Sequence, residues 1–261
     1  MRILQLTDTH VVKEGKAFRT SDSLTNLKKL IDYLLSYSLQ PDVAVLTGDV
    51  SNDGMLESYL LVKEQLLRLG CPFYVLPGNH DCRETLKEVF GKAACIEGEP
   101  ENNCLETEEA GLLFLDSSVP GSSYGQISSE TLRWVKDHLP DKNKPTIVFL
   151  HHVPFPTGYR IMDEKFPGAE NLIRLLADRS QTLLAAGHIH TGFITHYQGV
   201  LCLTCPSVTM MMSPDYEPIL GDTFYTEPAG FVVHDVKQGW IRSNICIVPD
   251  KENAGPYRFL E

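Results

Sequence analysis

The stretch that decides the expected fold is Thr182-Leu183-Leu184-Ala185-Ala186-Gly187-His188-Ile189-His190. Its apolar first part predicts a buried strand, and two histidines follow that strand with one residue between them. Side chains spaced in this way after a strand end can converge on one point. Polar residues follow other apolar runs in the same manner, at Asp8-Thr9-His10, Gly48-Asp49, Gly78-Asn79-His80-Asp81 and His151-His152. This regularity predicts a sheet whose strand ends carry a functional site.

Strands and helices alternate along most of the chain. Apolar runs predict strands at residues 2–7, 43–47, 72–76, 112–116, 146–150 and 182–186. Helical spacing of apolar residues and capping residues predict helices at 24–35, 55–69, 83–90, 128–139 and 169–178. This order is typical of parallel strands joined by crossover helices. Strands at 200–204, 231–235 and 240–248 follow without long helices, and we interpret them as antiparallel strands that close a second sheet.

The composition is that of an ordinary globular protein. With 261 residues, of which 43% are hydrophobic, the chain can bury a core without disulfides, and we expect a single domain over residues 1–261. A net charge of −11 disfavours nucleic acid and anionic membranes as partners. The N-terminal apolar run is too short for a signal peptide, and no run has the length of a membrane span. We therefore expect a cytoplasmic protein.

The seven cysteines are an odd number without a secretion signal, which favours reduced thiols. Cys202 and Cys205 form a C-x-x-C pattern, which also occurs in redox and zinc sites. These two residues lie three apart within the apolar run 200–205, which predicts a strand, so their side chains should point to opposite faces. We interpret them as small buried apolar residues.

The polar residues after the strands make a coherent set of metal ligands. Ligands of such sheets bind outside the carboxyl ends of the strands. The side chains expected there are Asp8, His10, Asp49, Asn79, His80, His151, His188 and His190. Carboxylate, imidazole and amide groups without thiolates suit Mn, Fe, Co, Ni or Zn without choosing among them. The set exceeds the needs of one metal, which indicates two metals that share a carboxylate, and we expect Asp49 to bridge them.

Other aspartates and histidines have simpler interpretations. Asp53 and Asp116 are expected to form turns or cap helices. His138, His196 and His234 are expected to be buried histidines that are hydrogen-bonded within the core.

The motifs D-x-H, G-D, G-N-H-D, H and G-H-x-H, in this order, resemble those of the calcineurin-like metallophosphoesterases. The resemblance extends from Arg2 to about His190. The segments around Asp8, Asn79 and His151 are also similar to those of bacterial class III cyclic nucleotide phosphodiesterases and of related glycerophosphodiesterases. The resemblance implies an α/β fold, namely a four-layered α/β/β/α sandwich with two mixed sheets flanked by helices.

The same resemblance implies a role for each motif residue. The first metal would be held by Asp8, His10, Asp49 and His190, and the second by Asp49, Asn79, His151 and His188. His80 stands where the family places a substrate-contacting histidine, and Asp81 where a carboxylate orients that histidine. Adjacent residues on a strand point in opposite directions, so only one of His151 and His152 is expected to reach the metals, and the family pattern favours His151.

The resemblance implies a dinuclear metal-dependent phosphodiesterase with two divalent ions, for which Mn, Fe, Zn and Co remain open. The expected substrates are small phosphodiesters, first 3′,5′-cyclic nucleotides of the cyclic AMP type, attacked at phosphorus by a hydroxide that bridges the metals. The alternatives are a glycerophosphodiesterase, a phosphoesterase of broad specificity, or a non-catalytic metal-binding scaffold. A homo-oligomer and the roles of Arg19 and of residues 209–226 stay open.

Overall fold

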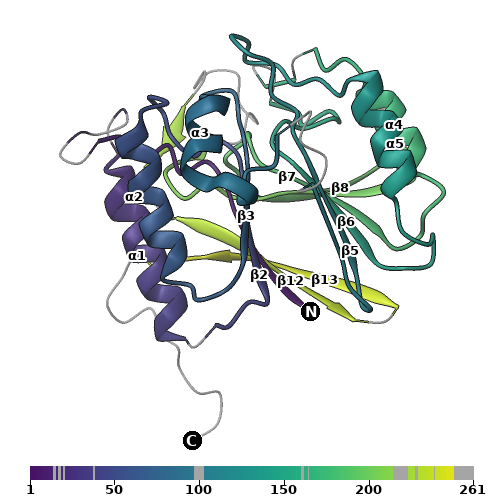
Figure 1. Cartoon of the computed structure of the whole chain (residues 1–261), viewed down its shortest axis with the longest axis horizontal. Coiled ribbons are helices and arrows are strands. Elements are labelled where there is room, and N and C mark those ends of the chain that lie inside the picture. The colour runs from purple at the N-terminus through teal and green to yellow at the C-terminus, as the bar shows by residue number, and fades with distance from the viewer. Residues whose placement is uncertain are drawn as a thin grey trace, which may run out of the picture.

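The computed structural model describes residues 1–13, 16, 19, 21–37, 39–96, 103–159, 162–163, 165–213, 223–226, 229–237 and 239–249. Two β-sheets lie face to face, with helices on the outer side of each (Figure 1). The first sheet has five strands, in the order β13 (Trp240–Ile247), β12 (Gly230–Lys237), β1 (Arg2–Leu6), β2 (Val43–Thr47) and β3 (Phe73–Leu76). Strands β1, β2 and β3 are parallel, whereas β12 and β13 are antiparallel.

The second sheet has six strands and is also mixed. Its order is β4 (Cys104–Glu106), β5 (Gly111–Leu115), β6 (Thr146–Leu150), β7 (Thr182–Ala186), β9 (Val200–Thr204) and β8 (Phe193–Tyr197). The four central strands are parallel, and the edge strands β4 and β8 are antiparallel to their neighbours. A separate two-stranded ribbon consists of β10 (Met211–Met212) and β11 (Phe224–Tyr225).

The helices form the two outer layers. They are α1 (Ser23–Ser36), α2 (Leu56–Leu67), α3 (Arg83–Phe90), α4 (Ser129–His138) and α5 (Ala169–Leu176), with a 3₁₀ turn η1 (Gly91–Ala93) after α3. Asp22 caps α1 by accepting a hydrogen bond from the Thr25 amide, and Ser128 caps α4 in the same way. Within the described part of the chain, no helix is both long enough and apolar enough to cross a bilayer.

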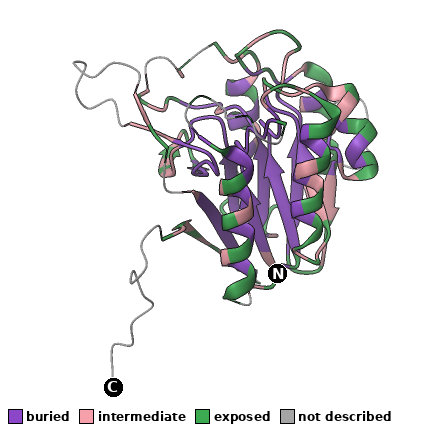
Figure 2. Ribbon diagram, turned by 90° about the vertical axis from the view of Figure 1, so that its left-hand side faces the viewer, coloured by how far each residue is buried: buried purple, intermediate pink, exposed green. Residues whose placement is uncertain are grey.

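Three apolar layers hold the sandwich together. Alternate residues of β2 show this directly, because Ala44 and Leu46 pack under α1, α2 and α3, whereas Val43 and Val45 pack between the sheets. On β6, Ile147 faces the space between the sheets and Val148 faces the layer of α4 and α5. Figure 2 shows the buried strands in the middle and the exposed residues on the outer sides of the helices. These layers confirm the predicted four-layered fold with two mixed sheets.

The placement of the last strands was predicted incorrectly. The strands expected at 231–235 and 240–248 are antiparallel, but they extend the first sheet beside β1 and do not close the second. The strand expected at 200–204 is parallel to β7. Strands β4 and β8 were not predicted, because edge strands bury only part of their side chains and therefore lack a continuous apolar run.

Cys202 and Cys205 are buried on opposite faces of the second sheet, in the outer and the inner apolar layer respectively. This confirms their interpretation as core residues. The interpretation of the three histidines is correct only for His234, which is fully buried. His138 and His196 are exposed, on α4 and on the edge strand β8, so their assignment to the core is wrong.

His234 belongs to a buried polar chain between the sheets. The side-chain amide of Gln5 donates to Thr47 Oγ1 at 3.2 Å and to the Ala186 carbonyl at 3.4 Å, so it links the two sheets. Its carbonyl Oε1 lies 3.0 Å from His234 Nε2, which must therefore carry the proton. Nδ1 then accepts from the Ser243 hydroxyl at 2.7 Å. Burial lowers the pKa of His234 to about 3.

Because the pKa of His234 is lower in the folded chain than its ordinary value of 6.5, its contribution to stability is complete above pH 6.5 and is lost as the pH falls. We expect the free energy of unfolding of the unmodified protein to fall by about 2 kcal/mol more than that of His234→Gln between pH 7 and pH 5. Denaturant unfolding of both proteins at both pH values measures this, and a pH-independent difference between them would contradict it.

Candidate metal centre

The polar residues expected at the strand ends do lie together. Both sheets contribute, because β1, β2 and β3 of the first sheet and β6 and β7 of the second end at the same place. The gathered side chains are Asp8, His10, Asp49, Asn79, His80, His151, His188 and His190. The site therefore lies across the line where the two sheets meet.

One group of ligand atoms comes from Asp8, His10, Asp49 and His190, all within 4.8 Å of one another. The Nε2 atoms of His10 and His190 are 3.1 Å apart, and His190 Nε2 is 3.2 Å from Asp8 Oδ1. Asp49 Oδ2 lies 3.5 Å from His10 Nε2. Each of these residues is at least nine-tenths buried.

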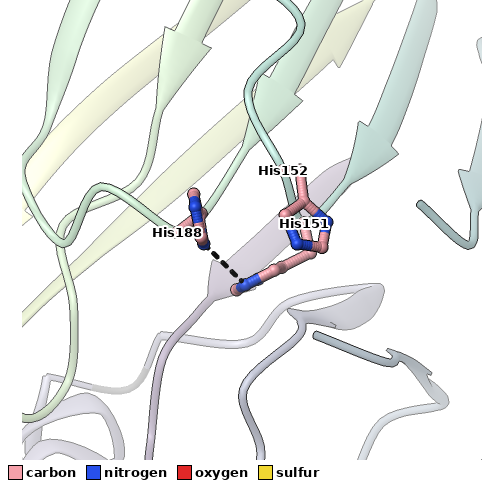
Figure 3. A group of neighbouring side chains, drawn as sticks. All are labelled: His151, His152 and His188. Atoms are coloured by element: carbon pink, nitrogen blue, oxygen red, sulfur yellow. Dashed lines mark hydrogen bonds between the residues drawn. The ribbon is translucent and has the colours of Figure 1, made fainter. Parts of the chain in front are cut away.

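A second group adjoins the first and shares the carboxylate of Asp49. Asp49 Oδ2 lies 3.4 Å from His151 Nε2, and the same nitrogen lies 3.2 Å from Asn79 Oδ1. His188 Nδ1 is 3.2 Å from His151 Nε2, as the dashed line in Figure 3 marks. A single oxygen of Asp49 is therefore close to both groups of side chains.

Hydrogen bonds to backbone carbonyls orient two of the imidazoles. His151 Nδ1 lies 2.8 Å from the Thr47 carbonyl, and His190 Nδ1 lies 3.2 Å from the Met210 carbonyl. A carbonyl can only accept, so Nδ1 carries a proton in both rings. Nε2 of both rings then faces the cluster, and this is the nitrogen through which such histidines would bind a metal.

The donor set fits divalent cations in chemistry and in spacing. Two ligands about 2.1 Å from one tetrahedral cation lie about 3.4 Å apart. The separations of 3.1–3.5 Å given above agree with this value, and the pair His10 Nε2 and Asp8 Oδ1 is somewhat farther apart, at 3.9 Å. The set contains carboxylate, imidazole and amide groups and suits borderline metals.

The protonation states also favour cation binding. Burial lowers the pKa of His10 and of His188 to about 3, which leaves both rings neutral and able to ligate. Burial would raise the pKa of Asp8, but His190 and His151 hold it below its usual range, so it is ionised. Burial would likewise lower the pKa of His151, yet Asp49 and Asp8 raise it to about 9. The negative charges of Asp8 and Asp49 thus favour a positive charge beside His151, which is where the second group of ligands lies.

Backbone strain is concentrated in the same residues. Asp8, His10, Asp49, His188 and His190 all have positive φ, between 41° and 70°. For residues other than glycine this left-handed conformation costs of order 1 kcal/mol each. Such strain persists where the surrounding structure imposes it. Here backbone hydrogen bonds join the loops to one another. Asp8 N donates to the Gly48 carbonyl, and Gly187 N donates to the His151 carbonyl.

Two glycines provide the space for this arrangement. A Cβ at Gly48 would lie 2.4 Å from His151 Nδ1, and a Cβ at Gly78 would lie 2.1 Å from Asp49 Oδ1. Neither contact is sterically allowed. The glycines of the G-D and G-N-H-D motifs are therefore needed because backbone and ligand side chains touch at these points.

His80 lies at the exposed side of the cluster, and its backbone amide donates to Asp49 Oδ1 at 2.9 Å. Its ring stands edge-on to that of His10, with the centroids 4.9 Å apart. This places an imidazole beside both groups of ligands but at the side that solvent can reach.

The carboxylate of Asp81 is held by four hydrogen bonds. Its carboxylate accepts hydrogen bonds from the amides of Val50, Ser51 and Gly78 and from the Tyr59 hydroxyl, at 2.8–3.1 Å. Burial and the charge of Asp49 raise the pKa of Asp81 to about 6. Asp81 thus joins the loop that carries Asp49 to the loop that carries Asn79.

His152 is buried against the cluster (Figure 3). Its ring centroid is 4.7 Å from that of His188, and its Nδ1 is 2.9 Å from Ser117 Oγ. A ligand atom of His152 lies within 4.8 Å of those of His151 and His188. The side chains of adjacent residues point in opposite directions only on a regular strand. His151 and His152 follow the end of β6, so both side chains can lie beside His188. The contacts to Asp49 and Asn79 involve His151.

A cavity of about 440 Å³ opens over the cluster. Its floor consists of ligand residues and His80, and its walls are lined by Arg19, Ser123, Met162, Met210, Met212, Thr223 and Phe224. Arg19, Met210 and Met212 fall in segments whose role the sequence left open. Thr223 and Phe224 also fall in the segment 209–226 that the sequence left open, whereas Ser123 and Met162 were missed as site residues, because no motif marks them.

Comparisons with known proteins agree with this geometry. A family profile described as calcineurin-like phosphoesterase matches residues 1–192. A probable glycerophosphodiester phosphodiesterase, GpdQ, of Arcobacter nitrofigilis is 35% identical over 245 residues, which are 90% of this chain and 88% of that protein. The 3′,5′-cyclic adenosine monophosphate phosphodiesterase CpdA of Escherichia coli K12 is 28% identical over 227 residues, 85% of this chain and 82% of that protein.

Among solved structures, a dimetal phosphatase from Danio rerio has the same fold, with a TM-score of 0.63 and 14% identity. The match covers 93% of this chain and 98% of that one. These likenesses confirm the family resemblance that the motifs indicated and the fold class expected from it.

Gly78→Ala should displace the Asp49 carboxylate and weaken metal binding about 10- to 100-fold, because the added Cβ would lie 2.1 Å from Asp49 Oδ1. Gly70→Ala is the control, since a Cβ at Gly70 meets nothing within 4 Å; its positive φ of 67° means that the variant should lose some stability but keep its metal affinity. Titration of both variants with Mn²⁺, followed by calorimetry, measures the effect. Equal metal affinity of the two variants would show that Gly78 does not provide this space.

Proposed function

This chain belongs to the calcineurin-like phosphoesterase family and is a hydrolase, and from that premise we propose that it hydrolyses small phosphodiesters at a dinuclear metal centre. The observation that carries the proposal is the position of Asp49 Oδ2, 3.5 Å from His10 Nε2 and 3.4 Å from His151 Nε2. A carboxylate oxygen between two complete groups of ligands is what a bridging ligand requires.

In this proposal Asp8, His10, Asp49 and His190 hold the first metal, and Asp49, Asn79, His151 and His188 hold the second. A pair of divalent ions offsets the negative charge that develops on phosphoryl oxygens and activates water near neutral pH. Asn79 contributes an uncharged oxygen, which binds without reducing the positive charge of the centre. The absence of thiolates from this donor set suits Mn, Fe, Co or Zn.

The residues around the centre position the reacting groups. His80 lies at the exposed side of the cluster and lines the cavity, so its imidazole can contact the phosphoryl group and give a proton to the departing alkoxide. The amide of His80 donates to Asp49 Oδ1, which leaves Oδ2 directed at the ligand groups. Asp81 acts through position, because it fixes the loops of Asp49 and Asn79 relative to each other.

The preferred substrates in this proposal are 3′,5′-cyclic nucleotides of the cyclic AMP type. The cavity of about 440 Å³ lies in the range of sites for small molecules and would not admit a duplex. The net charge of −11 also disfavours nucleic acid.

A glycerophosphodiester is the second candidate, favoured by the 35% identity to a probable glycerophosphodiester phosphodiesterase. A non-catalytic scaffold is disfavoured, because no motif position lacks its ligand.

Asp49→Ala should abolish turnover through loss of metal, because the variant lacks the shared ligand. His80→Ala should keep the metals but reduce kcat about 10²- to 10⁴-fold, the usual contribution of a general acid. Metal analysis and hydrolysis of bis(p-nitrophenyl) phosphate and cyclic AMP, both with added Mn²⁺, distinguish the two effects.

His138→Ala is the matched control for His80→Ala, since His138 is an exposed histidine on α4. It should behave like the unmodified protein in both measurements. An Asp49→Ala protein that retains full activity would disprove the proposal, and so would an unmodified protein that hydrolyses no phosphodiester when loaded with metal.

A further inference from the structure

The ribbon of β10 and β11 forms one wall of the cavity over the metal centre. Met212 and Phe224 are paired across this ribbon, and both line the cavity. The Thr191 hydroxyl donates to the Met212 carbonyl at 2.9 Å, and Ser213 N donates to the Thr223 carbonyl at 2.9 Å. The first bond ties the ribbon to the residue that follows His190, so the wall has a fixed place beside the first group of ligands.

The two faces of the ribbon differ in what they contact. Side chains alternate along a strand, so Met211 and Tyr225, the other cross-strand pair, lie on the face opposite to Met212 and Phe224. Tyr225 is 57% exposed. The cavity thus receives one methionine and one aromatic ring from a ribbon that carries the same kinds of residue on both faces.

Arg19 and a further methionine line the cavity together with Phe224. The guanidinium carbon of Arg19 lies 5.4 Å from the centroid of the Phe224 ring. Met162 lines the same cavity. An aromatic ring, a guanidinium plane and thioethers are groups against which planar bases pack well. Glycerol is small, polar and not planar, and it gains little from such a surface.

We propose that Met212 and Phe224, with Arg19 over the ring, are specificity-determining residues that bind a nucleobase. They give this chain a preference for nucleoside phosphodiesters over glycerophosphodiesters. The inference rests on the proposed function, since it states that the ribbon of β10 and β11 binds the organic group that is esterified to the phosphate. It adds a binding surface whose residues lie outside the ligand motifs.

The test compares kcat/KM for cyclic AMP and for glycerophosphoethanolamine in the Mn²⁺-loaded protein. Phe224→Ala and Met212→Ala should each lower kcat/KM for cyclic AMP about tenfold, the usual effect of removing one stacking group. Both should change kcat/KM for glycerophosphoethanolamine less than about twofold. Tyr225→Ala and Met211→Ala, on the opposite face of the ribbon, are the matched controls and should leave both values unchanged.

Equal losses for the two substrates, or equal losses in the control variants, would overturn the inference. Phe224→Leu retains an apolar side chain of similar size, so a selective loss of cyclic AMP turnover in it would exclude a folding defect as the cause. Calorimetric binding of AMP and of glycerol 3-phosphate to the same proteins is independent of turnover. AMP should bind about tenfold more tightly, and only Phe224→Ala and Met212→Ala should remove this advantage.

If the unmodified chain hydrolyses neither diester but binds AMP through Phe224, the proposed function is refuted and the nucleobase-binding surface is supported. If the unmodified chain hydrolyses both diesters and Phe224 contributes to neither, the proposed function is supported and the nucleobase-binding surface is refuted. The two failures are therefore distinguishable.

Discussion

The contact on which the site depends is the one between the buried carboxylate of Asp49 and imidazoles from both sheets. Asp49 follows β2 of the first sheet, whereas His151 follows β6 of the second, and Asp49 Oδ2 lies 3.4 Å from His151 Nε2. The two carboxylates in this buried cluster require compensating positive charge. That requirement explains the raised pKa of His151, and divalent cations would meet it while joining the two sheets.

Much of the surrounding structure serves to hold this contact. Glycines at 48 and 78 allow the loops to approach the ligand side chains, and positive φ angles turn Asp8, His10 and Asp49 toward one another. Asp81 compensates part of the strain, because its carboxylate binds three amides of these loops and the hydroxyl of Tyr59 on α2. Gln5 links the sheets just below the site, through Thr47 and Ala186. The site is therefore positioned mainly by loops that hydrogen bonds within the protein hold in place.

The sequence predicts the centre better than it predicts its surroundings. Asp8, Asp49 and His188 could be placed together because each follows an apolar strand and parallel strands end at one edge. The edge on which β12 pairs with β1 could not be predicted, since an antiparallel strand can join either sheet without a change in its own pattern. Phe224 enters the cavity through a short ribbon with no apolar run, so its role follows only from the structure. The partners of Asp81 likewise depend on loop conformation, which no motif specifies.

Anomalous diffraction from a crystal soaked in Mn²⁺ tests the central claim most directly. The account predicts two peaks in each chain, one in contact with Asp8, His10 and His190 and the other with Asn79, His151 and His188, with the Asp49 carboxylate bound to both. A single peak, or two peaks of which Asp49 touches only one, would contradict it.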